Sequence, residues 1–190
     1  MFYAIVVIFT LFFTTSLSLW VGLTINSVSF AYALLAPFAV NAYVLVLLGL
    51  LAILLRFFPK GLWNYRSTIF KVNQSQIKFL RSIKIQKWKD KIPEMGWTGG
   101  FEKKNIKSVE VKYLNKFLQE TCLAEILHLL AGILGFTVLF IFPVRDLYFS
   151  LPIAIVNLIL HILPCLIQRY TRFRMVPIYE HLSKKQIQTV

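Results

Sequence analysis

The sequence predicts an all-α integral membrane protein with four transmembrane helices and a basic, aromatic-rich interfacial segment between the second and third helices. Three observations support this fold class. Hydrophobic residues make up 57% of the 190 residues and charged residues only 15%, whereas soluble globular chains carry roughly 25% charged residues. No charged residue precedes Arg56, and so apolar a stretch is neither soluble nor disordered. Finally, 21 Lys and Arg stand against 8 Asp and Glu, and the basic residues gather in two parts of the chain.

Residues 1–55 predict an N-terminal transmembrane hairpin. A helix needs roughly 20 apolar residues to cross a hydrocarbon core of about 30 Å, and spanning segments are helical because lipid offers backbone groups no partners. Residues 2–23 have that length, and after a polar break the stretch 30–55 has it again, with Pro37 inside. A cleaved signal peptide is the alternative for residues 1–23, but no Lys or Arg precedes their apolar run.

Residues 121–174 predict a second hairpin, followed by a cytoplasmic tail at 175–190. Its first helix, residues 125–144, opens with Glu125 and His128. The second helix, residues 147–167, carries four residues that are unusual in a span: Pro152, Asn157, His161 and Pro164. Polar residues within a span usually face the bundle or a cavity rather than lipid.

The distribution of Lys and Arg predicts the topology, because these residues are retained on the cytoplasmic side. They are frequent between residues 56 and 120 and again after residue 167, whereas the two opposite connections hold only Arg145. Both termini and the segment 56–120 are therefore expected in the cytoplasm, in a multi-pass protein of a cell membrane.

The segment 56–120 mixes basic and aromatic residues, which favour anionic lipid and the headgroup level of a membrane. We expect it to lie on the membrane, with membrane lipids as partners. A weak apolar face is predicted from Ile77, Leu80, Ile83 and Ile85, and a loop from Pro93, Gly96, Gly99 and Gly100. Nucleic-acid binding is the alternative for such a composition, but the flanking spans argue against it.

A cluster at the start of the third helix can carry chemistry. Thr121, Glu125 and His128 are spaced four and three residues apart, so they share one helix face. A carboxylate beside an imidazole can fix its tautomer and favour its protonated form, which suits a general base for a hydroxyl. The structural alternative is that Glu125 pairs with a lysine and His128 hydrogen-bonds a neighbouring helix.

A polar stripe follows on the fourth helix. Its members are spaced by 4, 4, 3 and 4 residues: Asn157, His161, Cys165, Gln168 and Arg172. Near its end stand Arg169, Arg172 and Arg174, and guanidinium forks bind phosphates bidentately. Interhelical hydrogen bonding is the alternative for Asn157, and positive-inside anchoring is the alternative for the arginines.

No metal or other cofactor is expected. Two histidines and one carboxylate, here His128, His161 and Glu125, can hold iron or zinc, but helical di-iron sites need several more carboxylates. Cys122 and Cys165 lie near predicted cytoplasmic ends of their helices, where a structural disulfide is disfavoured. The sequence contains no CxxC motif, glycine-rich phosphate loop or nucleophile elbow.

Three stretches between residues 80 and 177 carry a family resemblance. They are Lys-Trp-Lys-Asp-Lys-Ile-Pro-Glu at 87–94 with Gly96, Glu-Thr-Cys at 120–122 with Ala124, Glu125 and His128, and Pro164 with Gln-Arg-Tyr at 168–170, Arg172 and Arg174. In this order they resemble the glycosyl-4,4'-diaponeurosporenoate acyltransferase family, small bacterial membrane proteins that esterify the sugar of a glycosylated carotenoid with a fatty acyl group. The chain departs from the family pattern at Leu123, where an Arg is usual, and at residues 171–174, where Asn-Arg-Pro-Arg is usual.

The resemblance implies acyl transfer in a bacterial cell membrane, from acyl-CoA as donor to a hydroxyl of a lipophilic glycoside, by resemblance a carotenoid glucoside. We expect His128 as general base and Glu125 or Glu120 as the carboxylate that orients it. The interfacial pocket is expected to be shaped by Trp88, Asp90 and Gln168. The donor phosphates are expected to meet Arg169, Arg172 and Arg174, assisted by Lys87, Lys89 and Lys91. The competing class is a non-enzymatic membrane module that binds anionic lipid or a partner protein.

Overall fold

The protein is helical throughout its regular structure. The computed structural model describes residues 2–92, 108–141, 143 and 146–188, and the side chains of all of these but 2–4 and 7. Within these residues there is no β-strand. Several residues of the sequence predictions lie outside the described residues: Pro93, Glu94, Gly96, Gly99, Gly100 and Arg145. The chain divides into two compact units, an apolar unit (Met1–Leu55 and His128–Ile162) and a basic unit (Arg56–Leu127 and Leu163–Val190).

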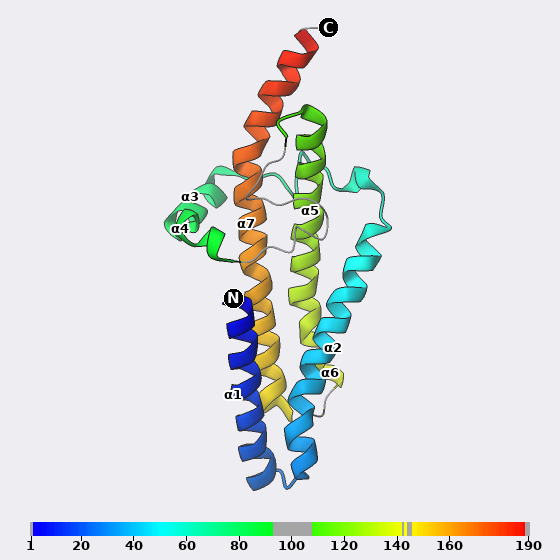
Figure 1. Cartoon of the computed structure of the whole chain (residues 1–190), viewed down its shortest axis with the longest axis vertical. Coiled ribbons are helices and arrows are strands. Elements are labelled where there is room, and N and C mark those ends of the chain that lie inside the picture. Colours follow the sequence, from blue (N-terminus) through cyan, green and yellow to red (C-terminus); the bar gives the residue numbers. More distant parts are fainter. Residues whose placement is uncertain (1, 93–107, 142, 144–145, 189–190) are drawn as a thin grey trace. The chain divides into compact units, whose positions relative to one another are not determined.

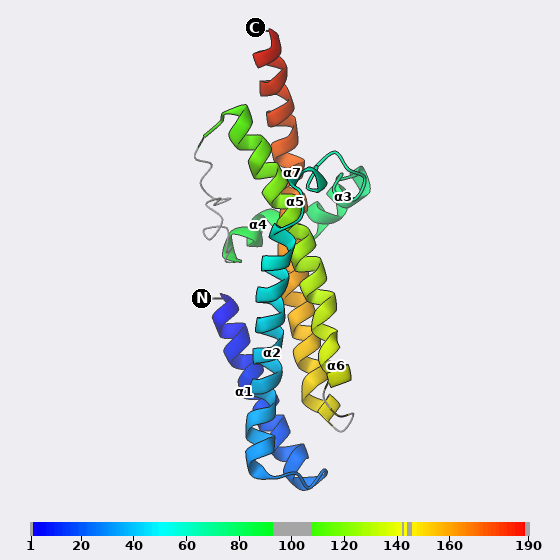
Figure 2. The same ribbon diagram turned by 90° about the vertical axis from the view of Figure 1, so that its right-hand side faces the viewer.

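The apolar unit consists of helices that run alongside one another (Figures 1 and 2). Its elements are α1 (Phe2–Thr24), most of α2 (Phe30–Arg56), the end of α5 (Val111–Leu134), η4 (Gly135–Thr137), α6 (Val138–Ile141) and the start of α7 (Leu147–Gln188). Inside α1, the hydroxyl of Thr10 donates to the carbonyl of Val6 and that of Thr14 to the carbonyl of Thr10, both at 2.7 Å. These hydroxyls are therefore satisfied within their own helix, as an environment without water requires.

The core of the apolar unit lies between α2, α6 and α7. One face of α2, with Ala36, Val40 and Val44 at every fourth position, packs against the other two helices. These contribute Val138 from α6 and Phe149, Ile153 and Ala154 from α7. Polar contacts connect α2 to residues just before α6 and α7: the hydroxyls of Tyr43 and Thr137 lie 2.8 Å apart, and the hydroxyl of Tyr32 donates to the buried carboxylate of Asp146. Outside this core many large apolar side chains are exposed, including Phe12 at 72%, so the unit presents the surface that lipid would cover.

In its described residues, the basic unit combines the remaining parts of α5 and α7 with four short helices. These are η1 (Lys60–Leu62), α3 (Gln74–Ser82), α4 (Ile85–Trp88) and η2 (Lys89–Lys91). A capping box starts α3: the side chain of Asn73 accepts from the backbone of Gln76 at 2.8 Å, and that of Gln76 accepts from the backbone of Asn73 at 3.1 Å. Ile77, Leu80 and Ile85 are buried, which confirms most of the predicted apolar face.

Three helices of the described chain are long and apolar enough to cross a membrane: Phe30–Arg56, Val111–Ile141 and Leu147–Gln188. A shorter apolar helix, Ile8–Thr24, precedes them. The all-helical class with several candidate spans is thus confirmed, while the fourth span and the interfacial segment stay predictions.

Two helices extend beyond the spans that hydropathy delimited. α5 begins at Val111 rather than near residue 125, and α7 continues to Gln188, so the expected tail at 175–190 is helical up to that residue. The reason is that Lys, Arg, Gln and Leu are good helix formers. In these two helices the change from apolar to charged residues does not mark the end of the helix.

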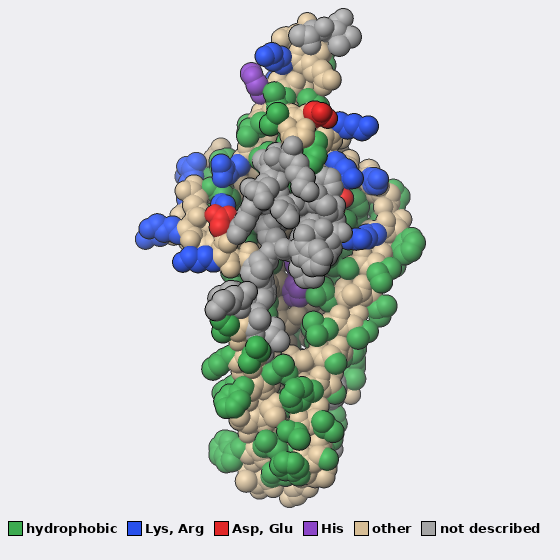
Figure 3. Space-filling model, viewed as in Figure 1, with side chains coloured by type: hydrophobic (Ala, Val, Ile, Leu, Met, Phe, Trp, Pro, Cys, Tyr) green, Lys and Arg blue, Asp and Glu red, His purple; other side chains and the backbone are tan. Residues whose placement is uncertain are grey.

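The two units differ in charge. Every Lys and Arg of the chain except Arg145 belongs to the basic unit. In Figure 3 blue basic side chains surround the elements of that unit, whereas green apolar side chains dominate the exposed side chains of the apolar unit. A chain patterned this way has one part suited to hydrocarbon and one suited to water and anionic headgroups.

Candidate functional site

A buried ion-pair cluster lies inside the basic unit. Glu125 of α5 is 3% exposed, and its carboxylate accepts hydrogen bonds from two arginines of α7. Nε of Arg169 donates to Oε1 at 2.7 Å, and Nη2 of Arg172 donates to Oε2. The arginines are three residues apart, so they share one helix face. Together they supply the counter-charge that a buried carboxylate needs.

The same arginines hold the segment that precedes α3. Arg172 donates to the carbonyl of Phe70 at 3.3 Å and to that of Thr121 at 3.1 Å, and its guanidinium lies 5.5 Å from the centre of the Phe70 ring. Arg169 donates from Nη2 to the carbonyl of Ile69 at 3.1 Å. Because a guanidinium carries five N–H donors in a rigid fork, two side chains are enough to tie α5, α7 and the incoming segment together.

Arg172 is buried among partners of the protein itself, and its predicted role as a phosphate ligand stays a prediction. Its side chain is 1% exposed and donates to three acceptors of the protein. A guanidinium in that position cannot reach a donor molecule unless the cluster opens. The side chain of Arg169 is 24% exposed and Arg174 is exposed, so these two arginines are more accessible to a phosphate than Arg172.

His128 has a second imidazole as a hydrogen-bond partner. In the apolar unit its Nδ1 lies 3.0 Å from Nδ1 of His161, and the ring centres are 5.3 Å apart with planes inclined by 37°. His161 is 8% exposed and His128 is half-buried. The predicted orientation of His128 by Glu125 or Glu120 stays a prediction, since the hydrogen bonds found at the Glu125 carboxylate come from Arg169 and Arg172. Among the described residues no group of three or more His, Cys, Asp or Glu is placed to hold a metal ion.

Small residues and one amide set the contact of α5 and α7 beside the histidine pair. Asn157, one turn before His161, donates from Nδ2 to the carbonyl of Ala131 at 3.0 Å, which confirms interhelical hydrogen bonding as its role. A Cβ at Gly135 would overlap the Asn157 amide, and one at Gly132 would lie 3.1 Å from a methyl group of Leu158. Glycine at 135 therefore lets the helices approach closely enough for the amide to bond across.

The other predicted site residues have separate surroundings in the basic unit. Glu120 is half-buried. The indole of half-buried Trp88 donates to a carbonyl of its own segment at 2.9 Å, and exposed Asp90 pairs with the adjacent lysine at 2.6 Å. Gln168 is 3% exposed, and no described residue hydrogen-bonds its Oε1. The pocket expected from Trp88, Asp90 and Gln168 stays a prediction.

A polar cavity of about 230 Å³ lies within the basic unit. Its lining is rich in amides and aromatic rings and consists of Gly61, Trp63, Asn64, Tyr65, Arg66, Asn115, Gln119 and Tyr179. The rings of Tyr65 and Tyr179 meet edge to face at 5.7 Å, and Arg66 donates from Nε to the Tyr65 hydroxyl at 3.0 Å. Burial raises the pKa of Tyr65 above its ordinary value, so the phenol stays protonated near neutral pH. Such a lining offers amide, phenol and guanidinium groups to a polar ligand.

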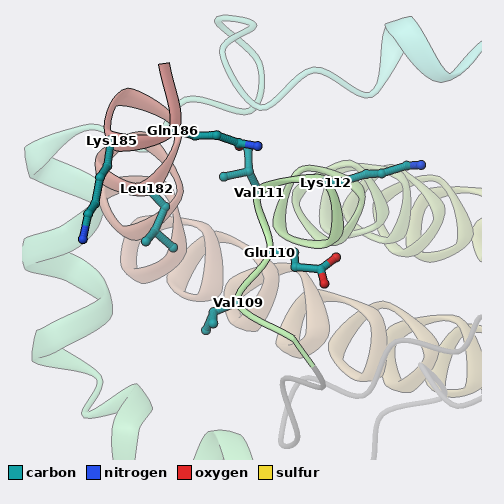
Figure 4. Close-up of a pocket in the computed structure, with 7 residues that line it drawn as sticks. All are labelled: Val109, Glu110, Val111, Lys112, Leu182, Lys185 and Gln186. Carbon is teal, nitrogen blue, oxygen red and sulfur yellow. The ribbon is translucent and has the colours of Figure 1, made fainter. Parts of the chain in front are cut away.

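A second hollow, of about 450 Å³, lies where the start of α5 meets the end of α7 (Figure 4). The surface that lines it is mostly apolar. The lining consists of Val109, Glu110, Val111, Lys112, Leu182, Lys185 and Gln186. In Figure 4 the amines of Lys112 and Lys185 point away from each other. The polar groups do not converge on a common point, so this hollow is a gap between helix ends rather than a binding site.

Several features of the site had no prediction from the sequence. The structural alternative for His128, a hydrogen bond to a neighbouring helix, is confirmed, but His161 of the predicted stripe had not been named as the partner. The carbonyls of Ile69 and Phe70, which accept from the arginines, carry no side-chain signal at all. Tyr65 and its neighbours around the polar cavity appeared only as part of an aromatic-rich composition.

These observations define a small helical protein with three described helices long and apolar enough to cross a membrane. Its helices α5 and α7 carry both a buried arginine–carboxylate cluster and a histidine pair. The chain belongs to the glycosyl-4,4'-diaponeurosporenoate acyltransferase family, whose model matches residues 61–181, well over half of the 190 residues. The match confirms the resemblance found in the three motifs, and it includes the arginine cluster, the polar cavity and both histidines of the pair. No curated protein and no solved structure matches the chain.

Proposed function

We propose that the protein is a membrane acyltransferase that esterifies a hydroxyl of a lipophilic glycoside, by resemblance a carotenoid glucoside, with a fatty acyl group from acyl-CoA. The observation that carries this proposal is the family match, because the family is described as an acyltransferase. The histidine pair supports it, since acyl transfer to a hydroxyl needs a group that takes up the hydroxyl proton. The apolar surface of the neighbouring helices suits substrates that are themselves lipophilic.

The proposed reaction uses His128 as the general base. Its Nδ1 is hydrogen-bonded to His161, and we assign the proton transfer to Nε2. Nε2 takes the proton of the acceptor hydroxyl while the hydroxyl oxygen attacks the thioester carbonyl. A C–O bond forms, the C–S bond breaks, and the proton passes from His128 to the leaving thiolate. The products are an ester and free CoA, and no further reactant is required.

We place the donor phosphates near Arg169 and Arg174 and leave Arg172 with its structural role. Arg174 is exposed on α7, and Lys87 and Lys91 are exposed in the same unit. Guanidinium binds phosphate through two parallel N–H groups, whereas an ammonium acts as a point charge. Trp88, Asp90 and Gln168 are proposed to shape the interfacial pocket beside this donor site.

The proposed topology has four spans, with α1 as the first and both termini in the cytoplasm. α1 has 23 residues, and a helix of that length rises about 35 Å, enough to cross a hydrocarbon core of about 30 Å. Residues 56–120 would then lie on the cytoplasmic face, where acyl-CoA is available and where basic residues meet anionic lipid. The proposed location is a bacterial cell membrane.

The test is a comparison of lipid extracts from a host that makes a carotenoid glucoside, with and without the gene, by mass spectrometry. We expect an acylated glycoside only with the gene. His128→Ala should lower its formation by about 10²- to 10⁴-fold, the usual contribution of general acid–base catalysis, while the protein still inserts. His181→Ala is the matched control, because His181 is the exposed histidine of α7. If no extract contains an acylated glycoside, the non-enzymatic membrane module becomes the better description.

A further inference from the structure

We propose that the polar cavity of the basic unit binds the adenine nucleotide end of the acyl-CoA donor; this inference rests on the proposed function. The cavity measures about 230 Å³, and its lining comes from the segment 61–66, from Asn115 and Gln119 of α5 and from Tyr179 of α7. Pockets that enclose a whole drug-sized ligand measure about 300 to 1,000 Å³. A cavity below that range is sized for one end group of a ligand, such as a purine ring.

Aromatic side chains form one part of the lining. Trp63 and Tyr65 are 9% and 8% exposed, and the ring of Tyr65 meets that of Tyr179 edge to face at 5.7 Å. These rings are therefore held in place by packing before any ligand arrives. Aromatic rings bind nucleobases by stacking, because every base has a flat π-face.

Two side-chain amides form another part of the lining. Asn115 and Gln119 are four residues apart on α5, so they lie on one helix face. Both are half-buried, and the structure gives neither side chain a hydrogen bond to another described residue. An Asn or Gln amide can accept from the amino group of adenine and donate to N7 at the same time. The two amides thus offer the polar contacts that a purine edge needs.

Arg66 adds a charge that favours a ligand with a phosphate. Its Nε donates to the Tyr65 hydroxyl at 3.0 Å, its side chain is 67% exposed, and its Nη2 lies 4.0 Å from a carboxylate oxygen of Glu180. An exposed pair at that distance is weak, so a phosphate can replace the carboxylate and bind the guanidinium through two N–H groups. In CoA the ribose next to the adenine carries a 3'-phosphate, whereas a neutral sugar would leave the charge of Arg66 unused.

The place of the cavity on α7 agrees with the donor phosphates proposed near Arg169 and Arg174. These two arginines and Tyr179 all belong to the part of α7 in the basic unit. Tyr179 is five residues beyond Arg174 and ten beyond Arg169, about 7.5 and 15 Å along the helix axis. In CoA the adenine nucleotide is followed by a diphosphate and then by the arm that carries the acyl group. The same order runs along α7 from Tyr179 towards its apolar start.

Calorimetric titration of the protein in nanodiscs of a zwitterionic lipid tests the site with three probes. These are CoA, dephospho-CoA, which lacks the 3'-phosphate, and 4'-phosphopantetheine, which lacks the adenine nucleotide. We expect Asn115→Leu/Gln119→Met to weaken CoA binding by about 10-fold or more and to leave phosphopantetheine binding unchanged, which also shows that the variant is folded. Arg66→Gln should abolish a preference of the wild type for CoA over dephospho-CoA. Arg81→Gln is the matched control, because Arg81 is an exposed arginine of the same unit outside the lining.

The same titrations can overturn the inference. Wild-type affinity for CoA in Asn115→Leu/Gln119→Met would do so, as would an equal loss of phosphopantetheine binding. Binding of methyl glucoside that the same substitutions abolish would assign the cavity to the acceptor sugar instead and would also overturn it. A protein that binds CoA as expected, in a host whose lipid extracts contain no acylated glycoside, would refute the proposed function and leave the nucleotide site standing. An acylated glycoside made by a protein that binds no CoA would refute the inference and leave acyl transfer with another donor.

Discussion

Removal of the Glu125 carboxylate is the sharpest test of what holds the basic unit together. Glu125→Leu leaves Arg172 with a guanidinium that is 1% exposed and has lost its counter-charge. Breaking a buried ion pair by removing one partner typically costs about 3 to 5 kcal/mol. The cost belongs to Arg172 rather than to Arg169, because the latter side chain is 24% exposed and can turn towards water. We therefore expect Glu125→Leu to lower the free energy of unfolding by about 3 to 5 kcal/mol.

The double variant Glu125→Leu/Arg172→Met tests the origin of that cost. Replacing both members of a buried pair by apolar residues of similar size is often close to neutral. The backbone carbonyls of Phe70 and Thr121 would lose the donors that Arg172 provides, and an unsatisfied buried group costs about 1 to 3 kcal/mol. We expect the loss in the double variant to be well below the sum of the losses in the two single variants, so that the two substitutions are strongly non-additive.

The assay is thermal unfolding of the purified protein in detergent, followed by the fluorescence of its four tryptophans. For soluble chains of this length 1 kcal/mol corresponds to about 2 to 4 °C in Tm, so Glu125→Leu should melt about 6 to 20 °C below wild type. Glu180→Gln is the matched control, because Glu180 is a half-exposed carboxylate 4.0 Å from Arg66 and such pairs contribute about 1 kcal/mol at most. A Glu125→Leu protein that melts like the control, or a double variant with the sum of both losses, would refute the reasoning.

Three further predictions concern topology, the donor and helix packing. A cysteine introduced at Lys89 should be labelled only from the cytoplasmic side, and labelling only from outside would reverse the proposed topology. Arg169→Lys and Arg174→Lys should raise the apparent KM for acyl-CoA while preserving topology, because anchoring needs only a cation whereas bidentate phosphate binding needs guanidinium; an unchanged KM in both would move the donor site elsewhere. Gly135→Ala should lower stability by about 1 to 3 kcal/mol, because its Cβ would displace an amide that bonds across two helices. Gly49→Ala, whose Cβ would meet nothing within 4 Å, should not be destabilising, and equal effects of the two would contradict this account of the contact.

The sequence by itself determined the class of protein and the main division of its chain. Hydropathy alone places long apolar helices at both ends, because a segment of about 20 uncharged residues has no stable alternative to burial in lipid or protein. The distribution of Lys and Arg separates a basic part of the chain from an apolar part, and the structure divides in the same sense near Arg56. The three motifs identified the family that the match over residues 61–181 confirms.

Only the tertiary structure decided which polar groups meet. Spacing along a helix puts residues on a common face, but it does not say which neighbouring helix, at which height, will supply the partner. Glu125 and His128 share a helix at i, i+3, yet the bonds found at the carboxylate come from Arg169 and Arg172, and the imidazole faces His161. Buried charges must be neutralised and buried donors satisfied, and the elements that do so here are separated from Glu125 and His128 by 33 to 47 residues along the chain. The register of α5 against α7, fixed by close packing at positions such as Gly132, therefore settled what the sequence pattern left open.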